Sequence, residues 1–435
     1  MARVRVRARV RPGLSARAAV ALALGVALAA SISGCSAAAS ADSAGGTALA
    51  TSAPTSSASA VPSATSTVAA TPAATATPAA RASPAATATA ATPAELDALY
   101  ASTRMHSMTL DAKLATMFMV QVPGTDPAPM VKYLAANGPG GFLLLGNNVP
   151  GSAGALRAQL AGVTLTAGLS PLVSIDEEGG DVARLGEDVF PGADQLKSLP
   201  VEETKASFTQ RAALLKSAGV SVNFGTVADV TADPGSFIFD RVLGTDPASS
   251  SARVAASVAA ENGSVFSTLK HFPGHGETNA DSHTSIPSTD LAFDQWQARD
   301  APPFAAGVDA GASLVMFGHL SYTSVDPEPA SLSARWHEIL RDDLGFTGVA
   351  VTDDMLMLQD SGLPEFADRS ANAVRAVSAG NDILLYNSAI DMSQPVAAIR
   401  AAVQSGQIGE DQIDESVVRI LTLQRQQWER THPAG

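Results

Sequence analysis

Fourteen residues, Lys270 to His283, hold a high density of side chains that could take part in chemistry. The segment reads KHFPGHGETNADSH and contains a lysine, three histidines and several acidic or amide side chains. Pro273 and Gly276 disfavour a helix or a central strand there. The apolar run 265–269 before it has strand character, so we predict a polar loop that begins where a buried strand ends. In α/β proteins, binding and catalytic sites lie at such positions.

Eight short apolar runs with strand character alternate with helical patterns over about 340 residues. This alternation predicts a (β/α)8 barrel with insertions. A doubly wound open sheet is the alternative, although no GxGxxG motif opens a helix after the first run. The runs are 118–122, 141–145, 171–175, 220–224, 265–269, 313–317, 348–351 and 382–386, and the helical patterns are a helix after Ser107 and 201–218, 248–260, 293–310, 334–344 and 365–379.

Polar side chains follow four of these runs. In a parallel barrel the ends of all strands open onto one face, so residues more than 170 positions apart would meet around one pocket. The polar residues are Asp176, Glu177 and Glu178 after the third run, Lys270 and His271 after the fifth, His319 after the sixth, and Asp353 and Asp354 after the seventh.

Three motifs together resemble glycoside hydrolase family 3, and most closely its single-domain bacterial β-N-acetylglucosaminidase branch. They are the 270–283 segment, DEEGG at 176–180 and GFTGVAVTDD at 345–354. The resemblance runs from about Met108 to about Glu429. It implies a retaining glycosidase that needs no cofactor.

The resemblance also implies the catalytic groups. Asp353 matches the nucleophile, an ionised carboxylate that forms a glycosyl-enzyme. Its alternative role is a helix N-cap, for which Asp354 is the better candidate. Asp281 and His283 match a histidine general acid/base that an aspartate orients, and their spacing lets both side chains point the same way from an extended segment. The alternative for His283 is an exposed loop histidine beside an unrelated aspartate.

Five further residues match sugar-binding positions of the family. Lysine and arginine there would also offset the negative field of the chain. For Lys270 the alternative is a lysine that covers apolar surface. His319 could either line the pocket or be a strand-end histidine whose hydrogen bonds are satisfied by the backbone. The five residues are Lys270, His271, Asp176, Arg184 and Arg241.

The sequence departs from the family pattern at two positions near the site. Glu177 and Asp181 stand where the family has Gln and Arg, which would alter the rim of the pocket or the packing of the loop. We expect no metal, because the spacing of His271, His275 and His283 matches no usual zinc site.

The N-terminal part predicts export and lipidation. Residues 1–34 combine six arginines with an apolar stretch that is shorter than a membrane span, and ISGC at 32–35 resembles a lipobox. We therefore expect a lipoprotein signal peptide (1–34), a lipidated Cys35 followed by a disordered Ala/Ser/Thr/Pro tether (35–94), and the barrel domain (95–435). In the alternative reading, Cys35 is incidental to an ordinary secretory signal.

The charge of the chain limits its partners. Removing six of 28 basic residues with the leader leaves 22 against 42 acidic residues, a formal charge of −20. Nucleic acid and anionic lipid are poor partners for such a chain, so we expect membrane attachment only through the lipid. The sequence thus predicts a monomeric, extracytoplasmic, lipid-anchored exo-β-N-acetylglucosaminidase acting on wall-derived glycans. A β-glucosidase-like exo-glycosidase and a catalytically silent glycan-binding lipoprotein are the alternatives.

Overall fold

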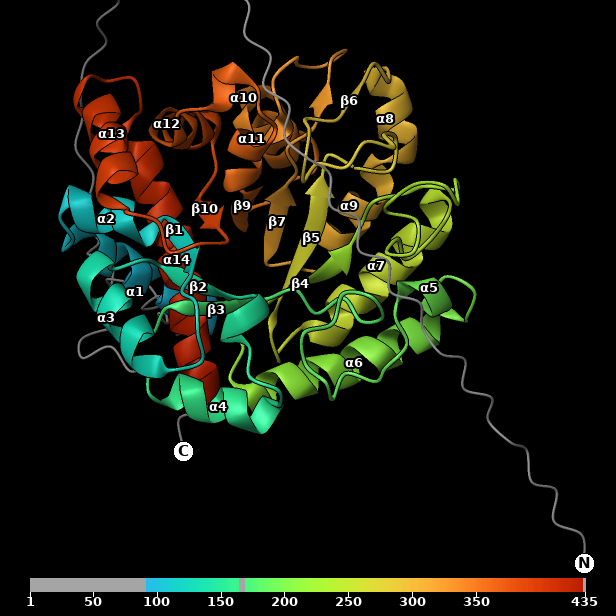
Figure 1. Ribbon diagram of the computed structural model, residues 1–435, viewed down its shortest axis with the longest axis horizontal. Helices are drawn as coiled ribbons and strands as arrows, with labels where there is room; N and C mark the ends of the chain where they lie inside the picture. The colour runs from blue at the N-terminus through green and yellow to red at the C-terminus, as the bar shows by residue number, and fades with distance from the viewer. Residues whose placement is uncertain (1–90, 164–168, 433–435) are drawn as a thin grey trace, which may run out of the picture. The chain divides into compact units, whose positions relative to one another are not determined.

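A computed structural model of the chain describes residues 91–163 and 169–432 (Figure 1). The predicted signal peptide and nearly all of the predicted tether, including Cys35, lie outside the described residues. The predicted catalytic region is described except for 164–168 and 433–435.

Eight parallel strands close into a barrel, which confirms the predicted (β/α)8 architecture (Figure 1). Their order is β1-β10-β9-β7-β5-β4-β3-β2, and Phe118 of β1 lies opposite Leu384 of β10, so the alternative of an open sheet is wrong. Each predicted run coincides with one strand. The strands are β1 (Phe118–Gln121), β2 (Gly141–Leu144), β3 (Leu172–Ile175), β4 (Val222–Val227), β5 (Phe266–Phe272), β7 (Leu314–Phe317), β9 (Val349–Asp354) and β10 (Ile383–Tyr386).

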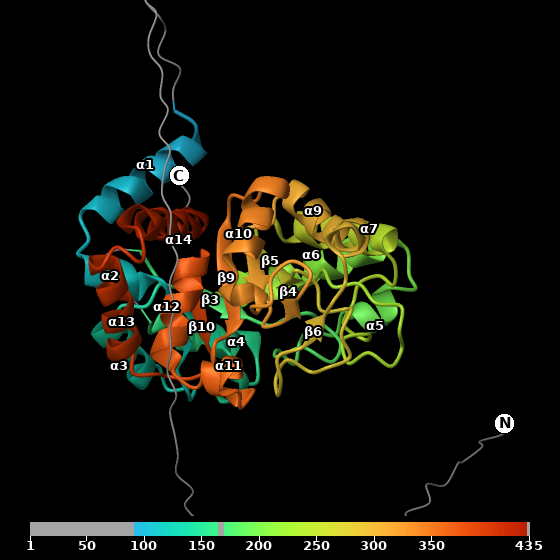
Figure 2. The ribbon, with the colours of Figure 1, turned by 90° about the horizontal axis from the view of Figure 1, so that it is seen from above.

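Helices surround the barrel (Figures 1 and 2). The predicted helix 293–310 is two helices that meet at Asp300, with Pro302 and Pro303 in the first turn of the second. The helices are α1 (Pro93–His106), α2 (Leu110–Thr116), α3 (Pro127–Asn137), α4 (Ala153–Ala161), α5 (Ala193–Leu196), α6 (Val201–Ala218), α7 (Pro247–Glu261), α8 (Phe293–Arg299), α9 (Ala301–Asp309), α10 (Ala334–Glu338, continued by a π-helical turn, Ile339–Asp343), α11 (Leu356–Asp360), α12 (Arg369–Ala379), α13 (Ser393–Gln404) and α14 (Glu410–Thr431).

Strand β4 is longer at its carboxyl end than the sequence pattern predicts. The predicted run stops at Phe224, before Gly225, and a Cβ on Gly225 would lie 2.6 Å from the Glu177 carbonyl oxygen and 2.3 Å from the side-chain amide nitrogen of Asn223. The glycine is therefore required by a close approach of backbone and side chain within the sheet. The strand continues to Val227 and brings Asp229 to the end of the barrel where β5 ends.

An aromatic cluster fixes the carboxyl end of β5. The ring of Phe272 contacts those of Trp296, Phe304, Phe317 and Trp336 edge to face, with centroids 5.1 to 6.1 Å apart. These side chains are fully or almost fully buried. The chain thus leaves β5 from a rigid base between the barrel and helices α8, α9 and α10.

Several elements of the fold were absent from the sequence prediction, including two short strands and helices α1 and α14. Short strands β6 (Ser288–Thr289) and β8 (Ser321–Tyr322) pair in parallel outside the barrel. Helix α1 packs against α14 (Figure 2) and begins two residues before the predicted domain boundary, with Thr92 and Glu95 forming a capping box. Among the described residues, none of the helices has the length and apolarity to cross a membrane.

Candidate active site

One cavity of roughly 400 Å³ opens at the carboxyl ends of the barrel strands. It gathers residues from β5, β9 and the loops after β3, β4 and β5, including Asp176 and Asp353, which are far apart in sequence. Asp281 is the one predicted catalytic or binding residue that does not line it, and this residue contacts His283, which does. The lining residues that the sequence predicted are Asp176, Arg184, Arg241, Lys270, His271, His283 and Asp353.

Lys270 is buried between two carboxylates at the end of β5. Its Nζ lies 2.8 Å from Asp176 Oδ1 and 2.7 Å from Glu178 Oε1. Burial lowers the pKa of Lys270, but the two carboxylates outweigh this and raise it above its ordinary value. The amine is therefore a charged donor inside the cavity, which excludes the alternative of a lysine that merely covers apolar surface.

Glu178, which was expected at the pocket but without a role of its own, holds two cations. Its carboxylate accepts hydrogen bonds from Arg241 Nε and Nη2 at 3.0 and 2.7 Å, in addition to the contact with Lys270. Burial raises the pKa of Glu178, but Lys270 and Arg241 outweigh burial and lower it to about 2. Lys270 and Arg241 are thus balanced locally by Asp176 and Glu178.

Asp229 is a second unpredicted carboxylate, and it orients the histidines. Its carboxylate lies 2.7 Å from His271 Nδ1 and accepts the backbone N–H groups of His271 and His275. Burial raises the pKa of Asp229, but the histidines outweigh this and hold it below its ordinary value. Burial also lowers the pKa of His275 to about 4, so this ring is neutral. Asp229 was missed because the fourth strand was predicted to end at Phe224.

Asp353 is half-buried at the end of β9 and lines the cavity. Burial raises its pKa, but His271, His319, the backbone N–H of Asp354 and Lys270 together hold it below its ordinary value. The carboxylate is therefore ionised. Asp354, not Asp353, accepts the N–H of Leu356, the first residue of α11, although Met355 and not Asp354 stands at the N-cap.

His319 is fully buried and lies behind the cavity wall. Its Nε2 lies 2.9 Å from the carbonyl oxygen of Asp354 and its Nδ1 lies 2.6 Å from Ser331 Oγ. Because a carbonyl can only accept, Nε2 donates. The histidine holds the backbone beside Asp353, and the backbone-satisfied alternative is correct.

The loop after β5 carries an aspartate–histidine pair at the mouth of the cavity. His283 Nδ1 lies 2.6 Å from Asp281 Oδ1, which also accepts the backbone N–H of His283 at 3.0 Å. Burial raises the pKa of Asp281, but these bonds outweigh it and lower the pKa. The predicted extended segment is wrong, because residues 282–284 form a turn closed from Thr284 N to the Asp281 carbonyl. The turn, not strand alternation, brings the two side chains together.

Glu177 takes part in loop packing and not in the pocket rim. It is fully buried and accepts the backbone N–H groups of Arg184 and Leu185 at 3.0 and 3.3 Å. Asp181 is exposed. Glu177, where the family has Gln, therefore supports the backbone that presents Arg184 to the cavity.

The histidines at the site are engaged with carboxylates or a hydroxyl. His271 contacts Asp229, His283 contacts Asp281, and His275 Nδ1 lies 3.4 Å from Thr278 Oγ1. Within 91–163 and 169–432, no group of three or more His, Cys, Asp or Glu side chains is arranged to hold a metal ion.

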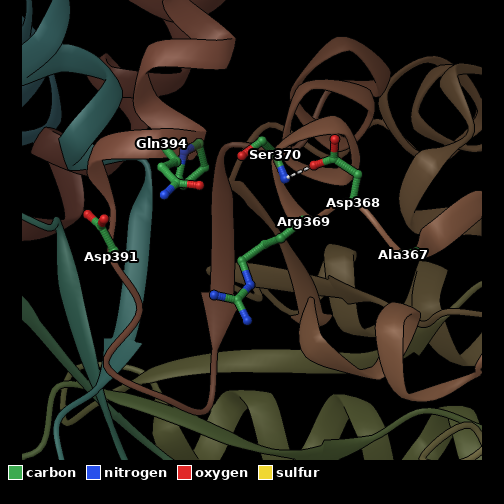
Figure 3. A pocket seen from close by; sticks show the side chains of 7 residues that line it. Ala367, Asp368, Arg369, Ser370, Asp391 and Gln394 are labelled. Atoms are coloured by element: carbon green, nitrogen blue, oxygen red, sulfur yellow. Dashed lines mark hydrogen bonds between the residues drawn. The ribbon is translucent and has the colours of Figure 1, made fainter.

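A second cavity, of roughly 540 Å³, lies between the N-terminal ends of α12 and α13 (Figure 3). Its carboxylates bind backbone at the helix starts: Asp368 caps α12 by accepting the N–H groups of Ser370 and Ala371, and Asp391, just before α13, accepts that of Ser393. Arg369 donates to Gln359. Since none of the predicted catalytic or binding residues lines this cavity, the chemistry belongs to the barrel cavity.

Comparison with known proteins gives consistent matches. A family model described as "Glycosyl hydrolase family 3 N terminal domain" matches residues 109–423. The β-hexosaminidase LpqI of Mycobacterium tuberculosis is 32% identical over 333 residues, 72% of this chain and 81% of that protein. A β-hexosaminidase of Xanthomonas oryzae pv. oryzae is 34% identical over 254 residues, 55% of this chain and 75% of that protein. A solved glycoside hydrolase family 3 β-N-acetylglucosaminidase from Paenibacillus sp. is 29% identical with a TM-score of 0.70, over 76% of this chain and 64% of that one.

Proposed function

The chain belongs to glycoside hydrolase family 3, and from this membership we propose that it is a retaining exo-β-N-acetylglucosaminidase. It would release terminal β-linked N-acetylhexosamine through a covalent intermediate. One observation carries the proposal: Asp353 and His283, from two distant parts of the chain, line the same cavity as the Lys270 and Asp176 pair. The names of the relatives support the choice of sugar.

Asp353 is the nucleophile in this proposal. It attacks the anomeric carbon, the bond to the leaving oxygen breaks, and the glycosyl-enzyme is then hydrolysed by water. Its lowered pKa supports this role, because only the ionised carboxylate can attack. Its position at a strand end supports it as well, since the barrel holds the carboxylate rigidly.

His283 is the general acid and base, and Asp281 orients it. The imidazolium gives a proton to the leaving oxygen in the first step and the imidazole takes one from water in the second. The hydrogen bond from Nδ1–H to Asp281 leaves Nε2 to carry the transferred proton. The exposure of His283, whose side chain is 65% accessible, suits a group at the mouth of the cavity that meets a leaving group of variable size.

The remaining polar groups bind the terminal sugar. Asp176 can accept hydroxyl protons while Lys270 and Arg241 donate, and their charges are balanced within the cluster. His271 and Arg184 complete the set. A fixed array of this kind orients a sugar by directional hydrogen bonds.

We further propose that the natural substrates are peptidoglycan-derived glycans and that Cys35 anchors the protein outside the cytoplasm. The lipobox-like ISGC segment and the Ala/Ser/Thr/Pro-rich composition of 35–94 support this location. The enzyme would act as a monomer, without a cofactor and without nucleic acid as a partner.

Hydrolysis of chromogenic β-N-acetylglucosaminide and β-glucoside tests the proposal. We expect the wild type to prefer the N-acetylglucosaminide, and Asp353→Asn to lose roughly 10³-fold or more in kcat while N-acetylglucosamine still binds. A preference for the glucoside would indicate a β-glucosidase-like enzyme. Glycan binding without hydrolysis in the wild type would indicate a catalytically silent binding protein.

A further inference from the structure

The loop that carries His283 is held at its base by an ion pair. Arg299, the last residue of α8, pairs with Glu277, which precedes Asp281 by four residues. Arg299 also contacts Asp300 at 3.2 Å, so one guanidinium joins the loop to the junction of α8 and α9. The side chains of Glu277 and Arg299 are only 22% and 34% accessible, so solvent screens this pair less than a fully exposed one.

The backbone on the N-terminal side of Glu277 is closely packed against the segment after β4. A Cβ on Gly276 would lie 1.8 Å from the Val230 carbonyl oxygen, so the loop backbone touches the segment after β4 at this point. Just before it, Trp296 Nε1 and the Tyr322 hydroxyl donate to the carbonyls of Pro273 and Gly274 at 2.9 and 2.6 Å. The loop therefore leaves a fixed platform, and Glu277 is the first side chain beyond it.

The other end of the loop is fixed as well. Ser321 N donates to the Pro287 carbonyl at 2.9 Å, and β6 pairs with β8 through Ser288 and Ser321. Between these ends, Asp281 and His283 are exposed while Ser282 is buried against the cavity. The direction in which the chain leaves Glu277 thus sets how far His283 reaches over the cavity.

We propose that the ion pair between Glu277 and Arg299 positions the general acid, with Arg299 acting through the loop and not on the substrate. This inference rests on the proposed role of His283. Protonation of the leaving oxygen matters most when that oxygen is a poor leaving group, and little when it is already stabilised as a phenolate. Loosening the pair should therefore slow the enzyme in proportion to the basicity of the leaving group.

The test uses aryl and alkyl β-N-acetylglucosaminides of graded leaving-group pKa and measures kcat/KM, which reports formation of the glycosyl-enzyme. For Glu277→Ala we expect a fall of about tenfold with the poorest leaving groups and less than about twofold with dinitrophenolate. In this variant Arg299 keeps Asp300 as a partner, so the fold is preserved. Arg299→Lys keeps the charge but loses the forked geometry, and should show a smaller steepening in the same direction.

Glu338→Gln is the matched control, because it breaks the exposed pair between Arg335 and Glu338 on α10 and should leave the profile unchanged. His283→Ala, which removes the acid itself, sets the steepest dependence of kcat/KM on leaving-group pKa that loss of the acid can produce. A flat profile for His283→Ala would contradict the acid assignment itself. The positioning role alone would be contradicted if kcat/KM depended steeply on leaving-group pKa in His283→Ala, but as in the wild type in both Glu277→Ala and Arg299→Lys. This includes the case in which both variants are slower by the same factor with every leaving group.

Discussion

Lys270 and Arg241 bring two positive charges into the cavity where Asp176 and Glu178 bring two negative ones. The cluster is close to neutral as a whole, yet each member is charged and hydrogen-bonded. A neutral sugar is therefore recognised by the direction of donors and acceptors and not by net charge. Removing one member would leave a buried charge without its partner, which costs more than the hydrogen bond itself.

Glu177 makes the stability of the fold depend on pH. Burial raises its pKa from the ordinary 4.5 to about 7, against the N–H groups of Arg184 and Leu185, which lower it. The folded chain keeps this proton where the unfolded chain has lost it, so stability present below pH 4.5 is lost as the pH rises through about 7. Glu177→Gln removes this titration. The free energy of unfolding should fall between about pH 5 and about pH 8 in both proteins. The fall should be smaller in Glu177→Gln than in the wild type, with a difference on the order of 2 kcal/mol.

Urea unfolding at the two pH values measures this difference. In Glu177→Gln the free energy of unfolding should still fall somewhat with rising pH, because burial also raises the pKa of Glu261 to about 7. Glu202→Gln, an exposed change on α6, should keep the wild-type slope. Equal slopes for Glu177→Gln and the wild type would show that Glu177 does not titrate in this range.

The residues that the sequence could not assign are those whose role depends on burial and on distant partners. Lys270 and Asp353 stand in recognisable motifs, so their place at the cavity could be predicted. Glu178 lies in the same motif as Asp176, but only the fold shows that two cations converge on it. Asp229 stands in no recognisable motif, because it lies beyond the predicted end of the fourth strand. Its partners are more than 40 residues away, His271 on β5 and His275 in the loop after it.

At the level of elements, the strands supply rigid ends and one loop carries His283, the proposed general acid. The eight strands could be predicted because runs buried on both faces are continuously apolar. The short pair β6 and β8 could not, since strands of two residues have no periodicity to detect. Yet this pair holds the far end of the loop that carries His283. The sequence therefore predicted the side chain but not the element that restrains its loop.

Gly276 tests how tightly the loop is joined to the barrel. Gly276→Ala would force a Cβ into the Val230 carbonyl, so we expect a loss of stability of about 2 kcal/mol and a marked loss of hydrolysis. Gly154→Ala in α4 is the control, because its Cβ meets nothing within 4 Å and a helix interior favours alanine. Thermal unfolding and kcat/KM measure both variants. Equal melting temperatures would contradict the close approach at Gly276.

At the level of the whole molecule, the acidic chain has a folded barrel and an N-terminal region of quite different composition. The barrel could be predicted from the alternation of runs and helices, and it accounts for where the site lies. Where the protein resides is a separate question, and we propose that Cys35 and the arginine-rich N-terminal segment determine it. The negative formal charge makes attachment through anionic lipid unfavourable, so a covalent lipid would have to supply the anchor.

Cys35→Ser tests the anchor. In the native host we expect the wild type in the membrane fraction and the variant in the soluble or secreted fraction, because a thioether-linked lipid cannot form without the thiol. Hydrolysis by the released variant should match that of the wild type, since the barrel is unchanged. A wild type that is already soluble, or a variant that stays with the membrane, would contradict lipidation at Cys35.

Capture of the covalent intermediate is the most direct measurement of the central claim. A fluorinated N-acetylglucosamine analogue with a good leaving group should slow turnover of the intermediate and label the enzyme, and mass spectrometry of the digested protein identifies the labelled residue. Our account predicts one sugar attached to Asp353, and no labelling of Asp353→Asn. Attachment to another carboxylate, such as Asp176 or Asp354, would contradict it, as would rapid inversion at the anomeric carbon without any adduct.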